Sequence, residues 1–168
     1  MRPQGVEMNW NTLVGNWSAD WHFLGGVALA MVLGSLIGLE REFAGKPAGL
    51  RTHMLLSGAS ALLTEVGLAM VHQSVSAPNP SLRADPVVIV QAVATAVGFI
   101  GGGTILRHPE TDRVEGLTTA ASLLLVAAIG MAAASSRAVL AIGVTLLALV
   151  VLRGVRWAEV KIGKRKPR

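Results

Sequence analysis

Long apolar stretches alternate with short charged segments along most of the chain. Each stretch approaches the roughly 20 residues that an α-helix needs to cross the hydrocarbon core of a bilayer. The charged residues fall between the stretches, which is typical of a protein that crosses the membrane several times. The pattern predicts five membrane-spanning helices, at residues 23–39, 54–71, 87–106, 117–134 and 138–152.

Composition supports a membrane protein. Of the 168 residues, 52% are hydrophobic and 15% are charged, and the mean hydropathy is +0.55. These values lie outside the usual range of soluble domains. The chain contains no cysteine, which excludes disulfides and thiolate metal sites. We therefore expect an all-α polytopic membrane protein, a bundle of about five transmembrane helices.

The distribution of the fifteen Lys and Arg residues predicts the orientation. With five spans and the N-terminus outside, twelve lie on the inner side and three, Arg2, Arg83 and Arg137, on the outer side. A four-span arrangement that omits the second stretch gives at best ten against five. Because basic residues concentrate on the cytoplasmic side, five spans with an outer N-terminus and an inner C-terminus are favoured. Topology thus explains the basic balance without nucleic-acid binding.

Three segments follow from this topology. Residues 1–22 form a periplasmic or interfacial segment, and its tryptophans favour a short surface helix over residues 8–21. Residues 23–157 form the transmembrane domain. The first apolar stretch is expected to be retained as a span and not cleaved as a signal peptide. Residues 158–168 form a basic cytoplasmic tail, which is expected to bind anionic lipids.

Small residues predict how the helices pack, because lipid provides no hydrophobic drive for helices to associate. Every fourth residue of the first span is small, at Gly26, Ala30, Gly34 and Gly38. The third span repeats this spacing at Ala94, Gly98 and Gly102, beside Gly101 and Gly103. We expect both stripes to be helix contacts. A faint parallel repeat joins "AGLRTHMLLSGASA" with "EGLTTAASLLLVAA", and chance similarity of apolar sequence is the alternative.

The segment "GLEREFAGKPAGLRTH", residues 38–53, carries the densest charge between two spans. Its structural interpretation is a charged cap at the membrane surface, with ion pairs among Arg41, Arg51 and the glutamates. Its functional interpretation is a docking surface or a cation entry site. His53 and Ser57 lie one turn apart, but no third catalytic group is specified. An interfacial histidine is therefore the favoured interpretation, and no catalytic residue is predicted.

Carboxylates also gather on the inner side, at Glu40, Glu42, Glu110, Asp112 and Glu115. Magnesium is usually held by one or two carboxylates and several waters. The spacing of these five specifies no coordination geometry, so neither a metal site nor a cofactor is predicted.

Glu65 is unusual because it interrupts the second apolar stretch. A charged side chain at the centre of a bilayer costs about 2.5–3.5 kcal/mol on insertion scales. Glu65 must therefore be shallow, neutral or partnered. Gln91 and Thr95 lie on one face of the third span at a similar depth, so we expect a hydrogen bond from Glu65 to one of them.

Three motifs, in this order and at this spacing, resemble the MgtC/SapB family of bacterial inner-membrane proteins. They are "GSLIGLEREFAGKPAGLRTHML", "VGFIGGGTIL" and "EGLTTAASLLLVAAIG". The similarity covers about residues 24–152, and the chain is expected to be a short form without the family's soluble C-terminal domain. Carried onto matching positions, the family residues are Glu40, Arg41, Glu42, Gly45, Gly49, Leu50, Arg51, Thr52, Gly98, Phe99, Gly101, Gly103, Gly116, Leu117, Thr118, Thr119, Ala120, Ala121 and Ser122.

The chain departs from the family pattern at three positions. Val88 stands where the family usually has Arg, Ala92 where it has Gln, and Leu124 where a Trp is common. The resemblance implies a multi-pass inner-membrane protein without enzyme activity. It also implies a role in growth at low magnesium and in virulence, exerted by restraining the membrane ATP synthase.

These observations give a leading hypothesis and two rivals. The leading one is a regulator of another membrane protein, ATP synthase or a transporter, and self-association into a homo-oligomer is a further candidate contact. Its functional cytoplasmic surface comprises Glu40, Arg41, Glu42, Arg51, Thr52, Thr118 and Thr119. The alternative is a small ion or solute transporter or channel, suggested by Glu65 and the glycine-rich third span. An intramembrane enzyme ranks third.

Overall fold

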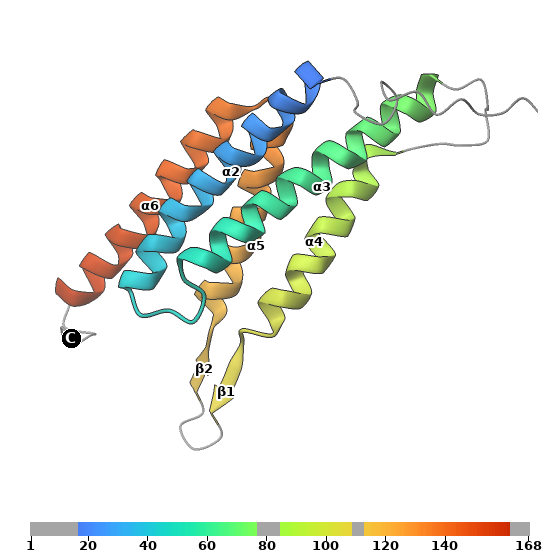
Figure 1. Cartoon of the computed structure of the whole chain (residues 1–168). Coiled ribbons are helices and arrows are strands. Elements are labelled where there is room, and N and C mark those ends of the chain that lie inside the picture. The colour runs from blue at the N-terminus through green and yellow to red at the C-terminus, as the bar shows by residue number, and fades with distance from the viewer. Residues whose placement is uncertain (1–16, 77–84, 109–112, 162–168) are drawn as a thin grey trace, which may run out of the picture.

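Five helices and one short hairpin make up the described structure (Figure 1). The computed structural model describes residues 17–76, 85–108 and 113–161. The helices are α2 (Trp17–Phe43), α3 (Leu50–Ser76), α4 (Pro86–Gly102), α5 (Leu117–Ala134) and α6 (Ala138–Lys161). The strands are β1 (Leu106–His108) and β2 (Arg113–Glu115). The predicted all-α fold with five helices is confirmed.

Three of these helices are long and apolar enough to cross a membrane. Their spanning segments are Asp20–Phe43, Leu50–His72 and Leu117–Ala134. The apolar parts of α4 and α6 are shorter, at Pro86–Gly102 and Ala138–Gly154. The first helix begins earlier than its apolar stretch, because Trp17 and Trp21 already belong to α2. Residues 8–16 of the predicted surface helix, and the basic tail from residue 162, lie outside the described residues.

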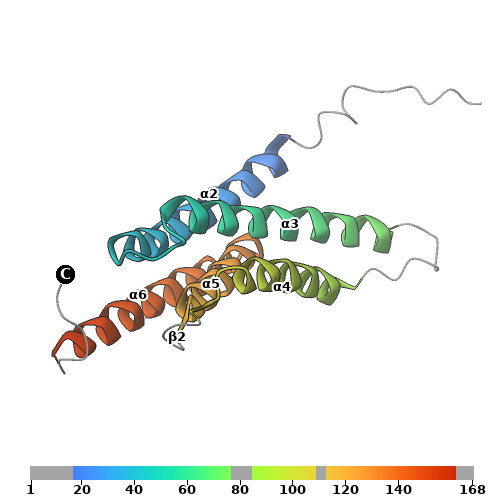
Figure 2. The same cartoon turned by 90° about the horizontal axis from the view of Figure 1, so that it is seen from below.

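The helices form two layers. One layer contains α2 and α3, and the other contains α4, α5 and α6 (Figure 2). The main core comes from small and branched side chains of four helices, for example Ile37 of α2, Ala61 of α3, Ile129 of α5 and Ala141 of α6, all at most 1% exposed. Large apolar side chains such as Leu62 and Leu147 point outward, as lipid-facing positions allow.

Glycines let α2 and α5 approach α3 from two sides. A Cβ atom on Gly34 of α2 would lie 2.7 Å from the His53 carbonyl oxygen, and one on Gly130 of α5 would overlap the Ser57 carbonyl oxygen. A Cβ atom on Gly38 would lie 2.8 Å from the Cα atom of Leu50. Gly26, in the same stripe, packs against α5. Ala30 is buried in the core. The small-residue stripe of the first span therefore lies in a helix contact.

The stripe proposed for the third span requires a correction. A Cβ atom on Gly98 or Gly102 would meet no atom within 4 Å, and Ala94 is exposed as well. The helix instead packs through its buried residues Val93, Val97 and Gly101. The four-residue periodicity was right but the face was wrong, because Val93, Val97 and Gly101 form the contact and Gly98 and Gly102 do not. Gly103 caps the end of α4, where its N–H group bonds to the Phe99 carbonyl at 3.1 Å.

The connection between α4 and α5 contains a small antiparallel hairpin. Leu106 pairs with Glu115 and His108 with Arg113. Gly116 then starts α5 with a φ of 92°, in the left-handed region that favours glycine. A Cβ atom there would overlap the Thr104 carbonyl oxygen. The hairpin thus turns the chain directly into α5, whereas a continuous span to residue 106 was expected.

The two predicted repeat units share one backbone hydrogen bond at the helix start, although Gly116 has a positive φ and Gly49 does not. In the first unit, the Gly49 carbonyl accepts the N–H of His53, and in the second the Gly116 carbonyl accepts the N–H of Ala120. The preceding helix approaches each unit at the same point, since Gly34 meets His53 and Gly101 meets Ala120. The sequence similarity therefore coincides with a similar helix crossing.

The glycine contacts lead to a stability prediction. Gly130→Ala should lower the thermal unfolding temperature of the purified protein in detergent, because overpacking a close contact typically costs about 1–3 kcal/mol. Gly143→Ala in α6 is the matched control, since its Cβ meets no atom within 4 Å. Alanine favours helix by about 1 kcal/mol over glycine, so the control should be neutral or stabilising. Equal behaviour of the two variants would contradict the close contact.

Candidate functional site

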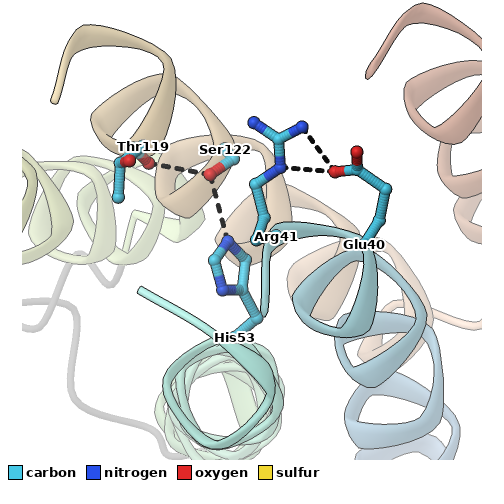
Figure 3. A network of polar contacts seen from close by, with 5 residues as sticks. All are labelled: Glu40, Arg41, His53, Thr119 and Ser122. Atoms are coloured by element: carbon cyan, nitrogen blue, oxygen red, sulfur yellow. Dashed lines mark hydrogen bonds and ion pairs between the residues drawn. The ribbon is translucent and has the colours of Figure 1, made fainter. Parts of the chain in front are cut away.

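Polar side chains are buried where α2 ends and where α3 and α5 begin (Figure 3). Glu40 and Arg41 come from the last turns of α2, and His53 from the first turn of α3. Thr119 and Ser122 come from the start of α5. None of the five is more than 4% exposed. We call these five residues the buried polar cluster.

His53 joins α3 to α5. Its Nδ1 atom lies 2.9 Å from the Gly49 carbonyl oxygen, and its Nε2 atom lies 3.0 Å from the Ser122 hydroxyl. A carbonyl only accepts hydrogen bonds, so Nδ1 carries a proton and donates it. The bond to Ser122 connects positions 69 residues apart in the sequence, and it ties the first charged turn to the third motif.

Ser122 has two neighbours that compete for its single proton. Its hydroxyl also lies 2.8 Å from the Thr119 carbonyl oxygen. When Nε2 of His53 is unprotonated, the Ser122 hydroxyl donates to the ring. When Nε2 carries a proton, the ring donates to Ser122, and Ser122 donates to Thr119. The cluster therefore has two hydrogen-bond arrangements that differ by one proton on His53.

Glu40 and Arg41 form a buried ion pair. Glu40 Oε2 accepts a hydrogen bond from Nε of Arg41 and forms an ion pair with its Nη2. The other carboxylate oxygen, Oε1, is buried and has no hydrogen-bond partner within the described residues. Arg41 is suitably placed in the last turn of α2, where the helix dipole favours a cation. The expected ion pairing of Arg41 with a glutamate is therefore formed, but the pair is buried.

The turn between α2 and α3 is fixed by Glu42 and Gly45. Glu42 Oε2 accepts the N–H of Leu50 at 2.8 Å and so caps the start of α3. Gly49 leaves room for this carboxylate, because a Cβ atom there would lie 2.7 Å from Oε2. Gly45 ends α2 with a φ of 64°, a common C-terminal cap conformation.

The predicted cytoplasmic surface is therefore only partly a surface. Arg51, Thr52 and Thr118 are exposed, as is Glu42. Glu40, Arg41 and Thr119 are buried instead. The ion pairing expected of Arg51 is not formed within the described residues, where the pair is Arg41 with Glu40. Burial follows from the crossing of α2, α3 and α5, which the sequence pattern does not show.

His53 and Ser57 also differ from expectation. Both are fully buried, so the His53 side chain lies between helices and does not face solvent or lipid. Ser57 Oγ has no hydrogen-bond partner within the described residues, and the ring bonds to Ser122 instead. Ser122 was missed as a partner because it lies among alanines and leucines. Its place in the third family motif was the available signal.

Glu65 does not meet α4. Its Oε1 atom lies 3.5 Å from the position of a Cβ atom on Gly26, so the carboxylate faces α2. Gln91 and Thr95 are exposed, and the Thr95 hydroxyl donates to the Gln91 carbonyl of its own helix at 2.7 Å. Because α4 packs through Val93 and Val97, positions two residues away point to the opposite side. The predicted Glu65 hydrogen bond is thus wrong.

The described residues contain no group of three His, Cys, Asp or Glu side chains that could hold a metal ion. Of the five carboxylates considered, Glu40 bonds to Arg41 and Glu42 caps α3. Glu110 and Asp112 lie outside the described residues.

The ion pair gives a prediction in which a double variant is the control. Arg41→Ala leaves the Glu40 carboxylate buried and unpaired, and breaking such a pair costs about 3–5 kcal/mol. Glu40→Leu combined with Arg41→Met removes both charges and should lose less stability. Thermal unfolding in detergent measures both. The interpretation is wrong if the double variant is the less stable of the two.

Comparison with known proteins agrees with the three motifs. The model of the MgtC family matches residues 27–161. The chain is 44% identical over 119 residues to protein SrpB of Synechococcus elongatus, covering 66% of this chain and 63% of SrpB. It is 32% identical over 148 residues to protein SapB of Bacillus subtilis, covering 88% of this chain and 62% of SapB.

Protein MgtC of Salmonella typhimurium is 35% identical over 102 residues, which cover 61% of this chain and 38% of that protein. The chain thus spans less than two thirds of the length of each of these relatives. No solved structure matches it. Since the family model covers most of the sequence, the chain belongs to the MgtC family and is a multi-pass protein of the bacterial inner membrane.

Proposed function

We propose that this protein regulates another membrane protein by direct contact during adaptation to low magnesium. The partner class is the membrane ATP synthase or a transporter. One observation supports direct contact with a partner. The buried polar cluster holds the turn between α2 and α3 in place, and residues next to the cluster are exposed. Arg51, Thr52 and Thr118 lie beside this cluster in sequence and are exposed, and Phe43 at the end of α2 is 78% exposed. We call these four residues the docking surface.

The same geometry supports a non-catalytic role. A catalytic histidine and serine must reach a substrate, whereas His53 is fully buried and Ser122 is 4% exposed. Their hydrogen bonds go to Gly49, to Thr119 and to each other. The pair therefore positions helices instead of facing a binding cleft. The link to magnesium rests on the family resemblance.

A small ion or solute transporter or channel is the second candidate. It is favoured by Glu65, a carboxylate in the spanning segment of α3 that lines a cavity beside α2. Intramembrane ionisable residues often mark ion pathways. Flux of magnesium, monovalent cations and protons into proteoliposomes separates this candidate from the first. A flux that Glu65→Gln abolishes would replace the regulator proposal with the transporter.

The regulator proposal predicts a selective loss of function. In a deletion strain grown in limiting magnesium, wild type should restore growth and Arg51→Glu should not, because charge reversal on the docking surface repels the partner without disturbing the core. Arg137→Glu, an exposed position at the start of α6, is the matched control and should rescue. Membrane levels of each variant are compared by immunoblot.

Partner capture completes the test. Cross-linking in magnesium-starved membranes should recover a membrane ATPase or transporter with wild type and with Arg137→Glu, but not with Arg51→Glu. Rescue of growth by Arg51→Glu at normal expression would remove the docking surface from the mechanism.

A further inference from the structure

A second site lies at the other end of α2, away from the buried polar cluster. A cavity of about 790 Å³ opens between the start of α2 and the later half of α3. Its volume falls in the range of about 300–1,000 Å³ that small-molecule sites occupy. The regulator proposal does not use this cavity, whereas the transporter candidate shares its Glu65. The inference below depends on neither.

The lining of the cavity combines apolar walls with acidic charge. Seven of the nine lining residues are apolar, among them Phe23, Leu62 and Ala69, and the other two are Asp20 and Glu65. None of the described residues that line the cavity is basic. Phe23 and Leu62 are also 39% and 54% exposed, so the walls continue into the lipid-facing surface. A ligand can therefore enter sideways from the bilayer.

Glu65 is available to a ligand. Its side chain lines the cavity and is half-buried, and its Oε1 atom lies 3.5 Å from the position of a Cβ atom on Gly26 of α2. Within the described residues Glu65 forms no hydrogen bond or ion pair. Asp20 begins the spanning segment of α2, six residues and therefore about 9 Å along the helix axis from Gly26. One carboxylate thus lies at the mouth of the cavity and one lies deeper.

Charge complementarity with these two carboxylates requires a cation, and the apolar walls decide which kind. A small inorganic cation held by one or two carboxylates keeps several bound waters, and the seven apolar lining residues offer those waters no side-chain hydrogen-bond partner. A large organic cation spreads its charge, loses little hydration and gains contact with apolar walls. We propose that this cavity binds a lipophilic organic cation, whose charge pairs with Glu65 and whose apolar groups pack against α2 and α3.

The test uses two probes of matched shape and opposite charge. Full-length protein in nanodiscs is equilibrated by dialysis with tetraphenylphosphonium or with tetraphenylborate, and empty nanodiscs correct for partition into lipid. Tetraphenylphosphonium should bind saturably, and tetraphenylborate should not. Equal saturable binding of both ions would show an unselective apolar groove and overturn the proposal, as would no saturable binding of the cation.

Variants locate the site. Glu65→Gln should weaken tetraphenylphosphonium binding about tenfold or more, because a carboxylate in a partly desolvated groove attracts a cation more strongly than in water. Glu65→Asp should retain most of the affinity, and Asp20→Asn should lose less than Glu65→Gln. Ala69→Phe should weaken binding with both charges intact, because it fills the cavity. Glu115→Gln on the hairpin is the control and should bind like wild type.

Unfolding temperatures verify that each variant is assembled. If Glu65→Gln does not assemble, two measurements still test cation binding in the cavity. They are the affinity of Ala69→Phe and the comparison of the two probes on wild type. Wild-type affinity in an assembled Glu65→Gln protein, or in Ala69→Phe, would overturn the assignment.

Discussion

Close approach of α2 and α5 to the backbone of α3, at His53 and Ser57, is the constraint on which the rest of this structure depends. Helices in lipid associate by packing and hydrogen bonding, since lipid tails compete for apolar contact. Gly34 and Gly130 leave the room in which α2 and α5 reach the backbone of α3. Once the three helices meet here, His53 lies one turn away from Ser57, within reach of Ser122. The packing of small residues thus determines the position of the polar ones.

The buried polar cluster adds specificity to this packing. A buried ion pair contributes little net stability, because desolvation offsets the attraction between its charges. Glu40 and Arg41 are also neighbours on one helix, so their pairing alone does not fix how the helices cross. The bond between His53 and Ser122 does so, because it joins two helices. Glu42, by capping α3, fixes the turn that brings His53 to this place.

Much of the fold could be predicted from the sequence, because hydropathy and helix length follow from composition along the chain. The five helices and the packed stripe from Gly26 to Gly38 belong to this class. The packing face of α4 could not be predicted, since Val93 and Val97 compete with Gly98 and Gly102 for the same contact. Spacing along one helix does not say which neighbour faces it.

The polar sites were less predictable for a related reason. The motifs identified Glu40, Arg41 and Thr119 as important, but their burial depends on three helices meeting. Glu65 was assigned to α4 because depth in the membrane was the available criterion, and depth does not distinguish α2 from α4. Ser122 carried no signal of its own apart from its motif. In each case the missing information was the angular position of one helix around another.

The bond between His53 and Ser122 also has a consequence for biosynthesis. The chain leaves the ribosome from its N-terminus, so α2 and α3 enter the membrane before α5 exists. Until Ser122 arrives, 69 residues later, Nε2 of His53 has no serine to bond with, and the backbone of Ser57 lacks its close contact with Gly130. The first helical hairpin is therefore an unfinished unit during translation.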